Sequence, residues 1–162
     1  MIVFVVGMAG ILVACQHTKR VANVEKPNAI AVENRKETKM TGIAFTVAKN
    51  YFVRNDAGKV HNPKIETAEE FRQIFGMAAT MGKNGRPTTI DFTRQYVIAV
   101  LLPETNRTTT IDPVSLRKDA MGEIVLTYKI VVGQEQSYTI IPNLIIVVDR
   151  SATGNVTLRA IK

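Results

Sequence analysis

Residues 96–102 read Tyr-Val-Ile-Ala-Val-Leu-Leu, an uninterrupted apolar run in the middle of the chain. A strand with one face in water alternates apolar and polar residues, whereas a strand covered on both faces is apolar at every position. The run is rich in β-branched residues, which favour strands, and Pro103 follows it. We therefore predict a central strand that has a packed layer on each face.

Further strands are expected after this run, because turn residues divide the sequence at regular intervals. We place them near 107–118, 123–132, 137–148 and 155–161, separated by turn clusters at 119–122, 133–136 and 151–155. In the second strand, alternate apolar residues from Leu126 to Val132 share one face. Short strands at this spacing predict an antiparallel β-sandwich or half-barrel.

The segment before the central run predicts a hairpin and one helix. Residues 43–53 and 59–65 suit two strands joined by the Asn-Asp-Ala-Gly turn at 55–58, and Pro63 confines the second strand to an edge. Residues 67–70, Thr-Ala-Glu-Glu, form a capping box that starts a helix. Apolar residues then recur at helical spacing (Phe71, Ile74, Phe75 and Ala78), and Gly76 or Gly82 is expected to end the helix. The expected fold class is thus mainly β (α+β), with about seven strands and one short helix packed against them.

Fourteen uncharged and mostly apolar residues precede Cys15, and the last three are Leu-Val-Ala. This ending resembles the bacterial lipobox, in which a peptidase cuts before a cysteine that carries a diacylglycerol. The run is too short to cross a bilayer, which takes about 20 apolar residues, but it suits a signal peptide. The alternative is a buried first element that happens to contain a cysteine, although the polar residues 16–20 end the run abruptly. Since Ile2 directly follows Met1 and no Lys or Arg lies between Met1 and the apolar run, either translation starts further upstream or the amine of Met1 supplies the positive charge.

These observations predict three parts of the chain: a lipoprotein signal peptide over 1–14, the lipidated Cys15 with a flexible tether over 15–42, and one β-rich domain over 43–162. The tether has mixed charge and no apolar period. In the bacteroidete lipoproteins that the leader resembles, an acidic run just after the cysteine accompanies display on the cell surface. Here Lys19 and Arg20 occupy that position. We therefore expect an anchor in the cell envelope, in the outer membrane and facing the periplasm rather than the surface.

The formal charge of +7 is spread along the chain after the leader. Residues 16–42 contain six Lys or Arg against three Glu, and residues 43–162 contain fifteen against eleven acidic residues. No aromatic-rich binding motif accompanies the basic residues, so we do not expect a nucleic-acid partner. Attraction to anionic headgroups or polysaccharide is the simpler interpretation.

The sequence has few groups that could perform catalysis. Cys15 is the sole cysteine, which excludes disulfides, thiolate metal sites and a thiol nucleophile from the predicted domain. The two histidines lie far apart in the sequence, and no Gly-x-Ser-x-Gly motif presents a serine. Asp91 is expected to cap a turn or to pair with Arg86 or Arg94. We predict no catalytic residue, no metal and no cofactor, and hence not an enzyme.

Two segments are candidate recognition surfaces. The first is a basic loop around residues 82–87, in which Lys83, Asn84 and Arg86 are candidate partner-binding residues, because no acidic residue occurs between 71 and 90. A solvated connection is the alternative for this loop. The second is the run Thr108, Thr109 and Thr110, which is typical of an exposed or edge strand that can pair with a partner's chain.

Several segments together resemble the C-terminal domain of the protease-complex subunit PrcB. They are residues 65–71 (Ile-Glu-Thr-Ala-Glu-Glu-Phe), 89–93 (Thr-Ile-Asp-Phe-Thr), 96–100 (Tyr-Val-Ile-Ala-Val), 138–142 (Tyr-Thr-Ile-Ile-Pro) and 144–148 (Leu-Ile-Ile-Val-Val). The resemblance spans residues 60–161, but the glycine-rich stretch expected after the central strand is replaced by Leu-Leu-Pro-Glu-Thr-Asn at 101–106. The family stabilises envelope protease complexes, so the resemblance implies binding rather than catalysis. The chain is also similar to small lipoproteins of gut bacteroidetes.

The sequence therefore predicts a lipid-anchored, non-catalytic envelope protein that binds a protein partner, for example a protease that it stabilises or inhibits. The alternative is an accessory lipoprotein that binds a small ligand or a glycan. Sugar sites usually contain an exposed aromatic ring, and the chain has no Trp and four Tyr, most of them at strand positions expected to be buried. The sequence leaves the oligomeric state open.

Overall fold

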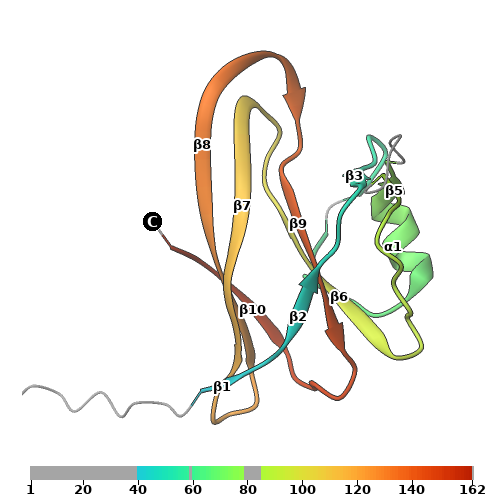
Figure 1. The fold of residues 1–162 in the computed structure, drawn as a ribbon, viewed down its shortest axis with the longest axis vertical. Helices are drawn as coiled ribbons and strands as arrows, with labels where there is room; N and C mark the ends of the chain where they lie inside the picture. Colours follow the sequence, from blue (N-terminus) through green and yellow to red (C-terminus); the bar gives the residue numbers. More distant parts are fainter. Residues whose placement is uncertain (1–39, 59, 79–84, 162) are drawn as a thin grey trace, which may run out of the picture. The chain divides into compact units, whose positions relative to one another are not determined.

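The computed structural model describes residues 40–58, 60–78 and 85–161, which belong to one compact unit, Lys36–Lys162 (Figure 1). The predicted signal peptide and most of the predicted tether lie outside these residues. The described part contains ten strands and one helix: β1 (Thr41–Gly42), β2 (Phe45–Val47), β3 (Tyr51–Val53), β4 (Lys64–Ile65), α1 (Ala68–Ile74), β5 (Phe75–Met77), β6 (Gln95–Leu101), β7 (Thr105–Lys118), β8 (Ile124–Ile140), β9 (Asn143–Asp149) and β10 (Val156–Ile161). The mainly β fold class with one short helix is confirmed. In this part of the chain, no helix has the length and apolar character needed to cross a membrane.

The strands form three sheets. Sheet A has the order β1-β7-β8-β10, sheet B has the order β2-β9-β6-β4, and sheet C is the pair β3-β5. Sheets A and B pack face to face as a sandwich, and α1 with sheet C covers the other side of sheet B (Figure 1). The strands pair in the predicted antiparallel way except at one place, where β10 pairs with β8 in parallel.

The predicted central strand is β6, and its two faces are both buried. Tyr96, Ile98 and Val100 point into the core between sheets A and B. Val97 and Ala99 point into the second core, beneath α1 and sheet C. Strand β9 pairs with β6 along its whole length and alternates between the same two cores. The continuous apolar sequence of residues 96–102 is therefore explained by a strand that has no solvent-facing side.

The predicted strand over 43–53 is broken into two strands that belong to different sheets. Phe45 and Val47 in β2 contact the core between the sheets, whereas Tyr51 and Val53 in β3 contact the second core. The chain changes direction at Asn50, whose φ is 63°. Asparagine tolerates this left-handed conformation better than most residues, which allows the segment to cross from one layer to the next.

The predicted hairpin between 43–53 and 59–65 was also wrong. Strand β4 pairs with β6 at the edge of sheet B, as Pro63 required, and β3 pairs with β5. The helix begins as predicted, because the Thr67 side chain accepts a hydrogen bond from the Glu70 amide. It ends at Ile74, before the predicted end at Gly76 or Gly82, because Phe75–Met77 pairs with β3 and buries Phe75 in the second core.

The predicted turn at 133–136 does not exist, and β8 continues through it to Ile140. Register shifts between Thr105 and Arg107 and between Arg107 and Thr109 give β8 extra residues in this region. Such bulges bend a strand without ending it, which accommodates the glycine at 133. The turns predicted at 119–122 and 151–155 are confirmed. The Asp119 carboxylate holds the first turn by accepting hydrogen bonds from the amides of Met121 and Glu123.

Candidate functional site

The predicted recognition residues that the structure describes occupy two different layers of the fold. Arg86 is exposed on the α1 side of sheet B, whereas Thr108–Thr110 lie in β7 of sheet A on the other side of sheet B. They do not form one surface. Cys15, Lys83 and Asn84 lie outside the described residues.

The threonine run lies at an edge of sheet A, as predicted. Within the described part, β1 covers β7 only at Arg117 and Lys118, so the strand has a single neighbour, β8, beside Thr108–Thr110. The Thr109 hydroxyl donates to the carbonyl of Arg107 at 3.0 Å. In the described part of the chain, this edge is thus available for pairing.

Arg86 borders a pocket of about 410 Å³ on the α1 side of the molecule. We call this the aromatic pocket. It is lined by Tyr51, Ala68, Phe71, Arg72, Phe75, Met77, Arg86, Pro87, Thr88, Thr89, Ile90 and Phe92. The lining comes from β3, α1, β5 and the segment before β6, so strand pairing and helix packing together create the pocket.

Four aromatic rings contribute to its apolar lining. The centroid of the Phe71 ring lies 5.0 Å from that of Tyr51, 4.9 Å from that of Phe75 and 5.7 Å from that of Phe92. The Tyr51 contact is edge-to-face, an arrangement that aromatic quadrupoles favour. Since Phe71 and Phe75 are buried core residues as well, the pocket is continuous with the second core. Of the apolar residues at helical spacing, Phe71, Ile74 and Phe75 thus belong to the second core, and Phe71 and Phe75 also line the pocket.

The wall of the pocket at residues 86–88 is held by hydrogen bonds to the start of β3. The Tyr51 hydroxyl donates to the carbonyl of Thr88 at 2.6 Å, and the Asn50 side chain donates to the carbonyl of Arg86 at 3.0 Å. The Lys49 amide donates to the Thr88 hydroxyl at 2.9 Å. Burial raises the pKa of the Tyr51 phenol, which favours the protonated form that donates this bond. The pocket is therefore preformed at this wall.

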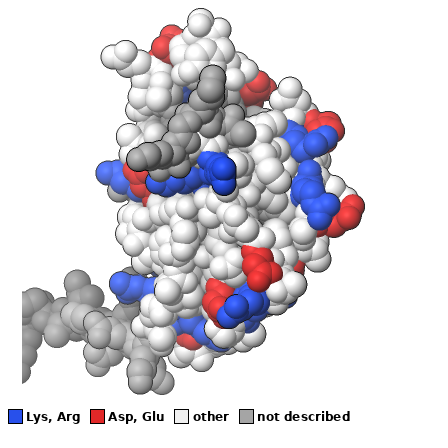
Figure 2. Space-filling model, turned by 45° about the vertical axis from the view of Figure 1, so that its right-hand side comes forward, with Lys and Arg blue, Asp and Glu red and all other residues white. Residues whose placement is uncertain are grey.

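The charges at the pocket have one sign. Arg72 and Arg86 line it, both are exposed, and none of the twelve lining residues is acidic. Within the described residues neither guanidinium forms an ion pair. On the face shown in Figure 2, most basic side chains lie beside acidic ones. The two arginines thus favour a group that is apolar and carries a negative charge nearby.

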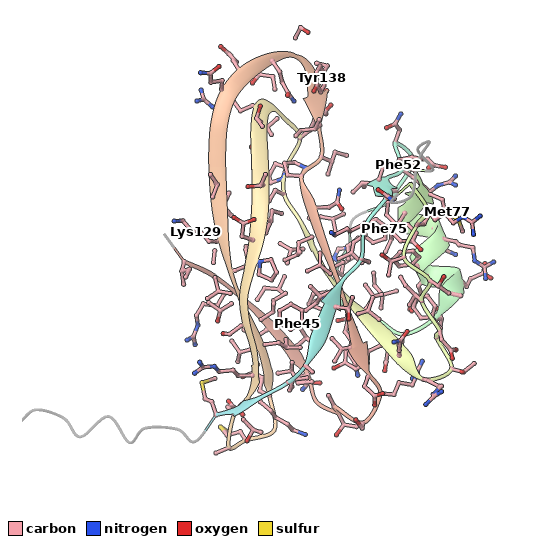
Figure 3. All side chains as sticks on the ribbon, viewed as in Figure 1. Phe45, Phe52, Phe75, Met77, Lys129 and Tyr138 are labelled. Atoms are coloured by element: carbon pink, nitrogen blue, oxygen red, sulfur yellow. The ribbon has the colours of Figure 1, made fainter. Side chains whose placement is uncertain are left out.

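Exposed apolar side chains also lie near this region, and the sequence did not predict them. Met77 is 69% exposed at the edge of the pocket, and Phe52 on the neighbouring strand is 49% exposed. Figure 3 shows Phe52 on β3 and Met77 on β5, and it shows Tyr138 near the end of β8. Tyr138 is 62% exposed, so the expectation that most tyrosines are buried holds only for Tyr96 and Tyr128. The helical spacing predicted a helix around Met77, so the sequence did not indicate that Met77 lies exposed on a strand.

Asp91 has the structural role that was predicted for it. Its carboxylate accepts hydrogen bonds from the Thr93 amide at 3.0 Å and the Thr93 hydroxyl at 2.6 Å, and so caps the turn before β6. These bonds, followed by the charge of Arg94, lower the pKa of the carboxyl. Among the residues that the structure describes, no three His, Cys, Asp or Glu side chains gather into a potential metal site.

Comparisons of the chain with protein-family models, with curated proteins and with solved structures find no match.

Proposed function

We propose that this chain is a lipid-anchored, non-catalytic protein of the cell envelope that binds a protein partner through the aromatic pocket. The observation that supports this most strongly is the combination of an aromatic lining with Arg72 and Arg86 and no acidic lining residue. Aromatic and arginine side chains are the residues that contribute most at protein interfaces. The pocket suits an apolar side chain of the partner that lies next to a carboxylate.

The resemblance to the PrcB domain supports a protease as the partner, which the chain would stabilise or inhibit. Binding needs no reacting group, and the pocket lining contains none of the paired nucleophile and base that hydrolysis requires. The lipid at Cys15 would hold the pocket close to a membrane and so raise the local concentration of a partner in the same envelope.

A crosslinking experiment tests the partner and its site together. A photo-crosslinking amino acid replaces Met77 at the edge of the pocket, and a control chain carries it at Met121, which is 92% exposed in the β7–β8 turn. After irradiation of intact cells, the chain labelled at position 77 should form one discrete protein adduct, and the control should form none. No protein adduct at position 77, or equal adducts at both positions, would contradict the proposal.

The arginines provide a second test within the same experiment. The double variant Arg72→Gln/Arg86→Gln should lower the yield of the adduct at position 77 at least fivefold. The matched variant Arg117→Gln/Arg159→Gln, which removes two exposed arginines from sheet A, should leave it unchanged. Equal yields from both double variants would show that the pocket arginines do not contribute.

The anchor is tested separately by intact-mass analysis of the native protein purified from membranes. The proposal requires a chain that begins at Cys15 and carries an acyl mass. A chain that retains Met1 without such an adduct would exclude the anchor, while leaving the pocket to be judged by crosslinking.

The volume of the aromatic pocket favours a second candidate, a small apolar anion, because pockets of about 300–1,000 Å³ are typical of small-ligand sites. Native mass spectrometry of the purified chain distinguishes the two. A retained small molecule that the Arg72→Gln/Arg86→Gln variant loses would support the ligand-binding alternative.

A further inference from the structure

Among the residues that the structure describes, strand β3 has a hydrogen-bonded strand on one side only. It pairs with β5 so that Phe52 lies opposite Gly76, and the Arg54 amide donates to the Ile74 carbonyl at 2.9 Å. At the other end, the Ala78 amide donates to the carbonyl of residue 50 at 2.9 Å. In an antiparallel ladder, alternate residues point their main-chain groups to opposite sides. The groups of Phe52 therefore face β5, and those of Tyr51 and Val53 face away from it.

A groove of about 600 Å³ lies on this open side of β3. We call it the β3-edge groove. Its first wall is β3 itself, and its second wall is formed by residues 139–141 and Asn143, where β8 turns into β9, together with Glu104. In Figure 1, β3 lies between β5 and β9, in agreement with these walls. Within the described residues, no strand pairs with β3 in this groove.

We propose that an extended segment of the partner protein binds in the β3-edge groove and becomes a third strand of sheet C. This inference rests on the proposed function, in which the partner is a protein. The main-chain amides and carbonyls of Tyr51 and Val53 have the spacing with which another extended chain pairs. A two-stranded sheet is marginal by itself, so a third strand also completes sheet C.

The charge of the groove specifies the segment further. Glu104 is the only charged residue in the lining, and it is exposed. The Thr139 hydroxyl donates to one of its oxygens, and in the described part of the chain no cation pairs with it. Ile140 and Ile141 supply apolar surface beside it. The segment that fits is therefore extended and carries a lysine or arginine opposite Glu104.

A selection from phage-displayed random heptapeptides on the immobilised mature chain tests this inference. Enriched peptides should contain a basic residue and bind to the free protein in solution. Val53→Pro removes one amide that faces the groove but none that pairs with β5, and Val53→Ala is the matched control for the smaller side chain. We expect Val53→Pro to weaken binding at least tenfold more than Val53→Ala, and Glu104→Gln to weaken it about fivefold. Equal affinities for the two Val53 variants, or no enriched peptide, would overturn the inference.

A second measurement does not depend on whether the proline variant folds. Each amide of an enriched peptide is methylated in turn, and the affinity of every methylated peptide for the unaltered chain is measured. If the peptide is a strand on β3, methylation at alternate positions should lower affinity at least tenfold, and the positions between should change it less than threefold. A uniform effect would overturn strand pairing. A protein adduct at position 77 together with such a uniform effect would leave the proposed function standing and refute only this groove.

Discussion

Gly154 is a glycine that the fold should not tolerate replacing. Its φ is 149°, a conformation that residues with a side chain rarely adopt. A Cβ at this position would overlap the carbonyl oxygen of Gly122 and would lie 3.3 Å from Cγ1 of the fully buried Ile124. The close approach brings the turn before β10 against the β7–β8 turn, where the Ile124 amide donates to the Asn155 carbonyl at 2.7 Å. Gly154→Ala must therefore separate two turns that together place β10 on β8.

Two costs add for this substitution. A non-glycine residue in such a conformation costs about 1–3 kcal/mol, and forcing extra volume against fixed backbone costs about 1–3 kcal/mol. One movement of the backbone can relieve part of both the strain and the overlap, so the costs do not add in full. We therefore expect a loss of about 3 kcal/mol in the free energy of unfolding. For a domain of this size, such a loss lowers the melting temperature by about 10–12 °C.

Urea unfolding followed by circular dichroism measures this loss, with Gly42→Ala as the matched control. A Cβ at Gly42 has no neighbouring atom within 4 Å, so the control should change the free energy of unfolding by less than about 1 kcal/mol, and in the stabilising direction. If Gly154→Ala and Gly42→Ala differ by less than about 0.5 kcal/mol, neither the positive φ nor the contact with Gly122 makes position 154 sensitive to a side chain.

Three further predictions concern the core, the pocket wall and the open strand edge. Burial, followed by the charge of Glu66, raises the pKa of Tyr96 to about 12. Since the phenol of the unfolded chain ionises near pH 10, the free energy of unfolding should fall between about pH 10 and 12 by up to about 1.4 kcal/mol per pH unit. Urea midpoints from pH 9 to 11 should show this fall, and Tyr96→Phe should reduce it. Asn50→Ala loses the bond to the Arg86 carbonyl and strains a positive φ, so it should destabilise by about 2 kcal/mol in urea unfolding; a loss no larger than that of Asn50→Gly would argue against strain. In hydrogen exchange of the free protein, the Tyr51 amide should exchange faster than the Phe52 amide, and the opposite order would contradict the open edge of β3.

Several features of the fold follow from short-range patterns in the sequence. Residues 96–102 are apolar at every position, and only a strand between two cores gives each of them an apolar neighbour. The capping box at Thr67 and the turn at Asp119 depend on hydrogen bonds between residues at most four apart. Such interactions are specified locally, which is why they were predictable.

The candidate site was predictable only in part. Arg86 was identified from the absence of acidic residues around it, since charge patterning is visible in the sequence. Its association with Arg72, Tyr51 and Phe92 was not visible, because these residues come from three separate segments. The chain brings them together only after α1 and sheet C have packed on sheet B.

The sequence by itself determined a β-rich domain, its doubly covered central strand, the start of its helix and two of its turns. The tertiary structure decided that residues 43–53 form two strands separated at Asn50 and that residues 75–77 form a strand paired with β3. It also decided that β8 continues through residues 133–136. The physical reason is that a strand satisfies its main-chain hydrogen bonds with residues far away in the sequence. The choice between helix, turn and strand at these places therefore depends on partners that no local pattern contains.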